Sequence, residues 1–103
     1  MRDADIGVRD LILEIGAGDG RLTVELAQRA GRVIAVELDP LLVGRLRTRF
    51  RRVGNVEIVH GDIRAVALPA EPFRAFGNIP FGLTNAVLRR LLDDPSGPVA
   101  PWI

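Results

Sequence analysis

Short aliphatic runs alternate along the chain with longer stretches of mixed polarity. Each run has four or five residues, which is too short for a helix and typical of a strand buried on both faces of a sheet. The runs predict four strands, at residues 11–15, 33–36, 56–59 and 73–76. The stretches between them have the spacing of amphipathic helices.

Apolar residues recur at every fourth position over residues 22–30 and 42–50, and a further apolar stripe covers residues 83–92. These spacings predict three helices that each bury one face. Asp39 and Pro40 precede the second stripe and suit the N-cap and first position of its helix. The residues expected to be buried by this helix are Leu42, Leu46 and Phe50.

Strands that alternate with helices of this length predict βαβ units and a parallel sheet. The fold class is therefore α/β, with helices flanking a partial parallel sheet. We expect residues 1–103 to form one partial domain, with its core at residues 8–93. Residues 95–103 contain three prolines without periodicity, and we expect an irregular tail there.

Composition excludes several classes of protein. Hydrophobic residues make up 48% and charged residues 26%, as in ordinary globular domains. Neither an apolar run of about 20 residues nor a signal peptide is present, so we expect a cytoplasmic protein without a membrane partner. The chain lacks cysteine and has a single histidine, His60, which argues against a metal site and against thiol chemistry.

Three alternating glycines, Gly16, Gly18 and Gly20, follow the first strand and precede the first helix. Glycine allows positive φ and a close approach of the backbone to a ligand, and the helix directs free N–H groups to the same place. Dinucleotide-binding domains need a glycine where Arg21 stands, so the spacing favours another adenosine ligand, S-adenosylmethionine. Glu14 or a loop carbonyl would bind its ammonium group. The alternative is a tight turn without a ligand.

Acidic residues follow the second and third strands. Glu37 lies 21 positions after Gly16, where a carboxylate accepts hydrogen bonds from both ribose hydroxyls of such a ligand. Its alternative roles are an exposed strand-end charge or the start of the next helix. Asp62 would accept the exocyclic amino group of the ligand's adenine, or cap a short helical segment at residues 63–67.

The segment Asn78-Ile79-Pro80-Phe81 follows the fourth strand. Adenine N6 is a poor nucleophile, and two carbonyl acceptors, the Asn78 side chain and the main chain near Ile79, would direct its lone pair at a methyl group. Pro80 keeps the preceding residue extended. Phe81 would stack on a base turned out of its helix. The alternative is an ordinary corner between a strand and a helix.

Five arginines fall within eight residues, Arg45–Arg52. They would contact RNA phosphates or form a solvated helix face. All fourteen basic residues of the chain are arginine, which we attribute to coding composition, and the net charge is only +1.

Four motifs together resemble a known family. Residues 14–20 (EIGAGDG), 36–39 (VELD), 60–62 (HGD) and 77–81 (GNIPF) look like successive motifs of the ribosomal RNA adenine N6-methyltransferases. Residues 73–84 look most like the erythromycin-resistance methylases. The sister branch, the small-subunit dimethyladenosine transferases, typically has Leu and Tyr where this chain has Ile79 and Phe81. The resemblance covers about residues 8–93.

The resemblance implies a Rossmann-like methyltransferase fold with strand order 3-2-1-4. It also implies that Gly16, Glu37, Asp62 and Asn78 contact S-adenosylmethionine, and that residues 78–81 hold the target adenine. Such enzymes methylate 23S ribosomal RNA and thereby block macrolide, lincosamide and streptogramin B antibiotics. Because methyl transfer from a sulfonium needs no poised general base, alignment of the reactants is the main catalytic task.

Family members carry an N-terminal segment that closes over the cofactor, further strands, and a helical C-terminal domain, none of which this sequence contains. We therefore expect a fragment or a truncated product whose fourth strand has an unpaired edge. Three alternatives stay open: a small-subunit dimethyladenosine transferase, a non-catalytic remnant that binds the cofactor, and an NAD-binding domain.

Overall fold

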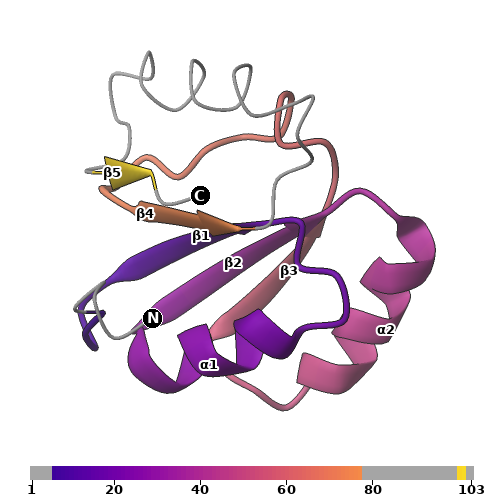
Figure 1. The fold of residues 1–103 in the computed structure, drawn as a ribbon, viewed down its shortest axis with the longest axis horizontal. Helices are drawn as coiled ribbons and strands as arrows, with labels where there is room; N and C mark the ends of the chain where they lie inside the picture. Colours follow the sequence, from indigo (N-terminus) through magenta and orange to yellow (C-terminus); the bar gives the residue numbers. More distant parts are fainter. Residues whose placement is uncertain (1–5, 78–99, 102–103) are drawn as a thin grey trace.

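A parallel sheet forms the centre of the chain in the computed structural model, which describes residues 6–77 and 100–101 (Figure 1). The spatial order of the strands is β3-β2-β1-β4-β5, and each neighbouring pair is parallel. The first four strands thus have the expected order. The strands are β1 (Leu11–Ile15), β2 (Arg32–Glu37), β3 (Val56–His60), β4 (Arg74–Gly77) and β5 (Ala100–Pro101).

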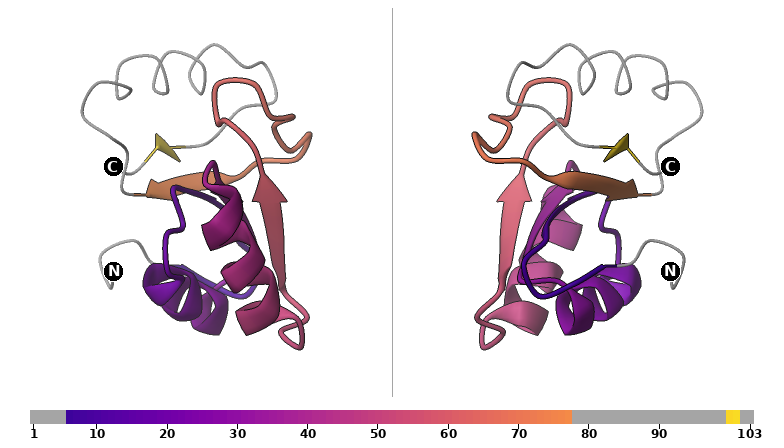
Figure 2. Two further views of the ribbon diagram at one scale, coloured as in Figure 1. Left: turned by 90° about the vertical axis from the view of Figure 1, so that its right-hand side faces the viewer. Right: turned by 90° about the vertical axis from the view of Figure 1, so that its left-hand side faces the viewer.

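Two helices, α1 (Arg21–Arg29) and α2 (Pro40–Phe50), lie on the same face of this sheet (Figures 1 and 2). The predicted N-cap of α2 is confirmed, because the Asp39 side chain accepts a hydrogen bond from the Leu41 amide at 2.8 Å. The buried residues of α2 are Val43, Leu46 and Phe50, whereas Leu42 is only half-buried. The helix is therefore rotated slightly from the predicted stripe.

The two faces of the sheet bury separate apolar clusters. Beneath the helices, Ile12 and Val33 of the sheet pack with Leu26 of α1, and Ala35 packs with Leu46 of α2. The opposite face is covered by the connection from β3 to β4. Its cluster contains Leu11, Leu13, Ile15, Val36, Ile63, Phe73 and Ala75.

Two local predictions differ from the structure. The segment after Asp62 forms a single hydrogen-bonded turn, in which the amides of Ala65 and Val66 donate to the Asp62 carbonyl, and not the short helix predicted at residues 63–67. Within the predicted irregular tail, β5 pairs with Arg74 and Ala75 of β4, so the first half of the fourth strand's edge is occupied. Its two residues include Pro101, and so short a strand has no periodicity that a sequence could reveal.

The helix predicted at residues 83–92 lies outside the described residues. Within residues 6–77 and 100–101, neither helix has the length and hydropathy needed to cross a bilayer.

Candidate functional site

A cavity of about 580 Å³ opens at the carboxyl ends of β1, β2 and β3. Open α/β sheets bind their ligands at this edge. Each strand contributes the segment at which it ends, so residues far apart in the sequence share one wall. The lining segments are Ile15 and Gly16, Val36–Pro40, and Gly61–Ile63.

The glycine turn has the backbone geometry that its sequence predicted. Gly16, Gly18 and Gly20 have φ values of 73°, 61° and 91°. The amide of Gly16 donates to the Val36 carbonyl at 2.9 Å, which fastens the turn to the end of β2. Because positive φ is strained for other residues, the turn depends on glycine at these positions.

Glu37 connects the glycine turn to the start of α2. Its carboxylate is buried and accepts hydrogen bonds from the Gly18 amide at 2.8 Å and from the Asp39 amide at 3.0 Å. The predicted alternative role at the helix start is therefore present, and Glu37 also lines the cavity. Its predicted role toward a ribose stays a prediction.

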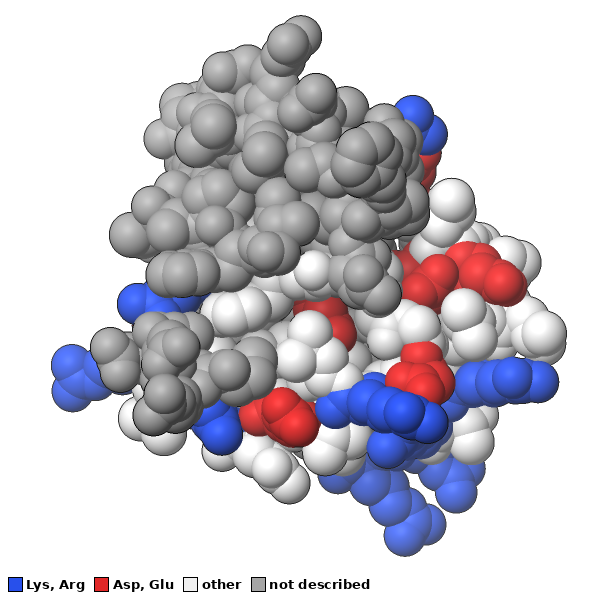
Figure 3. Space-filling model, viewed as in Figure 1, with Lys and Arg blue, Asp and Glu red and all other residues white. Residues whose placement is uncertain are grey.

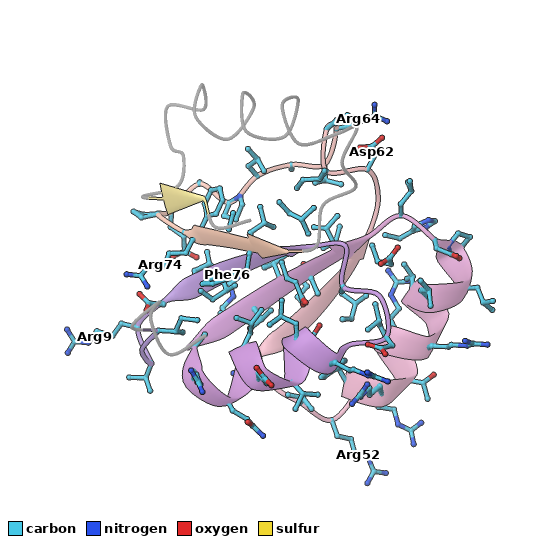
Figure 4. All side chains as sticks on the ribbon, in the orientation of Figure 1. Arg9, Arg52, Asp62, Arg64, Arg74 and Phe76 are labelled. Atoms are coloured by element: carbon cyan, nitrogen blue, oxygen red, sulfur yellow. The ribbon has the colours of Figure 1, made fainter. Side chains whose placement is uncertain are left out.

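Asp62 also lines the cavity, and its carboxylate is paired with the side chain of Arg64 (Figure 4). Asp62 Oδ1 accepts from the Arg64 amide at 2.9 Å and from Nε at 3.0 Å, and Oδ2 accepts from Nη2 at 2.6 Å. These bonds and the charge of Asp62 raise the pKa of the Arg64 guanidinium above its usual value. The predicted capping role of Asp62 is thus present in a single turn, while its adenine-binding role stays a prediction.

Glu14 is buried beneath the glycine turn and does not line this cavity. The hydroxyl of Thr23 in α1 donates a hydrogen bond to its Oε1. Burial raises the pKa of Glu14 to about 7. The hydrogen bond from Thr23 lowers this pKa by a smaller amount, and the nearby charge of Glu37 raises it further. The hydrogen bond ties β1 to α1 across the turn, and the proposed contact of Glu14 with an ammonium group stays a prediction.

Sequence reasoning missed Thr23 and Arg64 as partners of these carboxylates. Thr23 stands among apolar residues on the inner side of α1, and a polar residue at a buried helical position is a signal that it has a partner. Arg64 follows Asp62 by two residues, a spacing that an Asx turn brings together.

The charged residues among those that line the cavity are acidic. Glu37, Asp39 and Asp62 all line it, and none of its lining residues within the described ranges is basic. Figure 3 shows acidic side chains near the start of α2 and basic ones along the rest of that helix. The cavity therefore favours a ligand that is cationic or rich in hydrogen-bond donors.

The segment from Asn78 to Phe81, which we predicted to hold the acceptor, lies outside the described residues. The last described residue before it is Gly77, which is the register partner of Ile15. A Cβ on Gly77 would lie 2.2 Å from the Ile15 carbonyl oxygen, so only glycine lets β4 approach β1 this closely. Ile15 itself lines the cavity.

Over the described ranges, no three side chains of His, Cys, Asp or Glu gather as they would around a metal ion. His60 lies at the end of β3, with its Nε2 3.1 Å from the Leu38 carbonyl oxygen.

Comparison with known proteins relates this chain to enzymes that modify ribosomal RNA. The family described as "Ribosomal RNA adenine dimethylase" matches residues 1–100. The chain is 41% identical over 93 residues to an rRNA adenine N-6-methyltransferase of Bacillus licheniformis, covering 90% of this chain and 32% of that protein. It is 45% identical over 89 residues to a probable ribosomal RNA small subunit methyltransferase A of Methanosarcina barkeri, covering 86% and 31%.

Solved structures show the same relationship. The crystal structure of the 23S rRNA methyltransferase ErmE matches with a TM-score of 0.87 and 37% identity, over 96% of this chain and 41% of that one. A dimethyladenosine transferase from Plasmodium falciparum matches with a TM-score of 0.76 and 30% identity, over 94% and 37%. The chain spans about a third of the length of the curated relatives it matches.

Proposed function

Because the chain belongs to the ribosomal RNA adenine dimethylase family, we propose that it performs S-adenosylmethionine-dependent N6-methylation of an adenine in ribosomal RNA. One observation carries the proposal. The cavity walled by Gly16, Glu37 and Asp62 adjoins the end of β4, and the Asn78 motif is the next segment of the chain.

The chemistry of the cavity fits this methyl donor. The donor carries a sulfonium and an ammonium group, and the acidic walls attract both charges. Glu37 would accept hydrogen bonds from the ribose hydroxyls, and Asp62 from the adenine amine. Gly16 and Gly18 have no Cβ, so the methionine part can approach the backbone closely. When bound, S-adenosylmethionine would supply a methyl group from its sulfonium, and transfer of that group leaves a neutral thioether.

The acceptor side depends on Asn78, Ile79, Pro80 and Phe81. Two carbonyl oxygens, from the Asn78 side chain and the main chain near Ile79, would accept the two hydrogens of the target N6. This arrangement directs the N6 lone pair at the methyl carbon, and the amine releases its extra proton to water after the bond forms. The task of these residues is to hold the base in line, which is the main source of rate for such a transfer.

We propose 23S ribosomal RNA as the substrate, and resistance to macrolide, lincosamide and streptogramin B antibiotics as the result. Ile79 and Phe81 match the erythromycin-resistance branch, and the 23S rRNA methyltransferase ErmE aligns over 96% of this chain. The competing substrate is small-subunit ribosomal RNA, because a relative named as a probable small-subunit methyltransferase is 45% identical to this chain over 89 residues.

Incubation of the purified chain with labelled S-adenosylmethionine and with protein-free 23S or 16S ribosomal RNA tests the proposal. We expect label in adenine of 23S RNA. Label in 16S RNA alone would reassign the substrate. Binding of the cofactor without transfer to either RNA would refute methylation by this chain and identify a cofactor-binding domain.

Replacing Asn78 tests the acceptor directly. We expect Asn78→Ala to lower methyl transfer by at least about a hundredfold, because one of the two acceptors of the target amine is lost. Affinity for RNA should stay within about twofold. Asn55→Ala is the matched control, since Asn55 lies in the turn before β3 and donates to the carbonyls of Ala27 and Ala30, remote from the cavity. Unchanged transfer by Asn78→Ala would refute the assigned role.

A further inference from the structure

The arginines of α2 and of the turn that follows it form a basic surface beside the cavity. Arg45, Arg47, Arg49, Arg51 and Arg52 are all exposed. No acidic residue occurs between Pro40 and Val56, whereas the nine remaining arginines of the chain face thirteen acidic residues. The positive charge of this protein is therefore concentrated on α2 and the turn that follows it, while the rest of the chain is net negative.

The arginines of this surface form no salt bridges with the described residues. In the described part of the chain, the salt bridges involve Arg21, Arg32 and Arg64, and none involves the five arginines of the surface. Arg49 differs from the others, because its Nη1 donates to the Asp19 carbonyl at 2.6 Å and its guanidinium lies 5.6 Å from the centre of the Phe50 ring. Arg49 thus holds α2 against the glycine turn.

Helix stability does not account for the whole surface. Basic residues in the last turn of a helix interact favourably with its dipole, which explains Arg47 and Arg49. Arg45 lies in the middle of α2, and Arg52 lies beyond the end of the helix. Arg45 gains little from the dipole, and within the described residues neither Arg45 nor Arg52 is held in a salt bridge, so both charges are available for a partner.

A hollow beside the cavity runs along the same helix. It has a volume of about 480 Å³, and Arg45 and Arg49 form part of its wall. Pro40 lines both this hollow and the cavity, so the two openings adjoin. Leu41 lines the hollow as well and is 63% exposed. An apolar contact beside two guanidinium groups suits a sugar and its phosphates.

We propose that this surface, formed by α2, Arg51 and Arg52, binds backbone phosphates of the RNA that flanks the target adenine. The proposal rests on the proposed function for the identity of the partner. The acidic walls of the cavity repel a phosphate backbone, whereas α2 extends for about 16 Å from the cavity edge and attracts it. RNA helices are recognised largely through such phosphate and ribose contacts.

The test compares two double variants that remove the same charge. Arg45→Gln/Arg52→Gln removes two guanidinium groups from the surface and leaves the structural residue Arg49 in place. Arg9→Gln/Arg29→Gln is the control, because both residues are exposed and neither belongs to the basic surface. Figure 4 shows that Arg9 and Arg52 project from different sides of the molecule. Binding of a labelled stem-loop of about 30 nucleotides is measured at several salt concentrations.

We expect the α2 variant to bind the stem-loop about tenfold more weakly at low salt, with a slope of log affinity against log salt smaller by about 1.5. The control should bind like the wild type. Equal weakening of both variants would overturn the proposal, because net charge alone would then explain binding. Failure of the wild type to bind the stem-loop would also overturn it.

Titration of the same samples with S-adenosylhomocysteine separates this proposal from the proposed function. If all three proteins bind S-adenosylhomocysteine normally and have equal salt slopes for the stem-loop, the role of the α2 surface is rejected and the proposed function is unaffected. If the wild type does not bind S-adenosylhomocysteine, but the α2 variant alone shows a smaller salt slope for the stem-loop, the basic surface is supported and the methyl-donor site is rejected.

Discussion

Gly20 is the residue at which the glycine turn and both helices meet. Its φ is 91°, and a Cβ there would lie 2.8 Å from Cε2 of Phe50 and 3.1 Å from Cδ2 of Leu46. The packing of α2 therefore depends on a hydrogen atom at this position. Gly44, by contrast, lies in α2 with open space around it.

We expect Gly20→Ala to lower the free energy of unfolding by about 1–3 kcal/mol, because the backbone is strained and the Phe50 ring must move. Gly44→Ala is the matched control and should raise it by about 0.5–1 kcal/mol, because alanine restricts the unfolded chain and favours the helix. Urea unfolding of both variants measures the difference. Equal effects of the two substitutions would show that Gly20 is not constrained.

Glu14 makes the stability of the chain depend on pH. Its pKa is raised from 4.5 to about 7 by burial, so the folded state holds the proton more tightly than the unfolded state. The contribution of Glu14 to the free energy of unfolding is therefore largest below about pH 4.5. It falls as the pH rises to about 7 and is constant above that. The total change amounts to about 3 kcal/mol.

Glu14→Gln should remove this dependence and keep an oxygen that accepts the Thr23 hydroxyl. We expect the variant to be more stable than the wild type by up to about 3 kcal/mol near pH 8, and nearly equal to it near pH 4. Urea unfolding across this pH range is the measurement. The same pH slope in both proteins would mean that the pKa of Glu14 is the same in the folded and unfolded states.

At the scale of the element, α2 combines a capped start, a buried face and a basic outer face. Its first turn also lines the cavity through Pro40. The Asp39 side chain accepts the Leu41 amide at 2.8 Å, which satisfies one of the free donors at the start of the helix. The position of this wall of the cavity therefore depends on the Asp39 cap together with Glu37, whose carboxylate accepts the Asp39 amide at 3.0 Å.

Asp39→Ala should lower the free energy of unfolding by about 1 kcal/mol through loss of the cap. Asp39→Asn keeps a capping oxygen and should cost only a few tenths of a kcal/mol. Thermal unfolding of both variants distinguishes the cap from the charge. Equal losses would show that the negative charge, and not the hydrogen bond, stabilises this helix.

At the scale of the whole molecule, the parallel order of the strands gathers the candidate site at one edge. β1, β2 and β3 each end at the cavity, and β4 runs beside β1 toward the same edge. The site is built from segments of the native sheet, so a ligand that fills it binds the folded chain and not the unfolded one. Ligand binding should therefore stabilise the fold.

We expect S-adenosylhomocysteine at about 100 times its Kd to raise the free energy of unfolding by about 2.7 kcal/mol. NAD at the same concentration should have no effect, because Arg21 occupies the place of the third glycine in the dinucleotide motif. Urea unfolding with each ligand makes the comparison. Stabilisation by NAD alone would favour a dinucleotide-binding domain.

Predictions from local pattern were confirmed where the pattern is itself the cause of the structure. The aliphatic runs become strands because their side chains suit burial on both faces, and Asp39-Pro40 starts α2 because both residues fit a helix N-terminus. The glycines after β1 have positive φ because other residues are strained there. The order of the first four strands, expected from the family, was confirmed as well.

What the sequence by itself determined is thus the strands β1 to β4, the helices α1 and α2, their order, and the family to which the chain belongs. Only the tertiary structure decided which partner each acidic side chain has, with Thr23 for Glu14, Gly18 for Glu37 and Arg64 for Asp62. It also decided that β5 pairs with the first two residues of β4. The physical reason is that hydrogen bonds and edge pairing depend on which segments meet in space, whereas hydrophobic periodicity and backbone preference act within a few neighbouring residues.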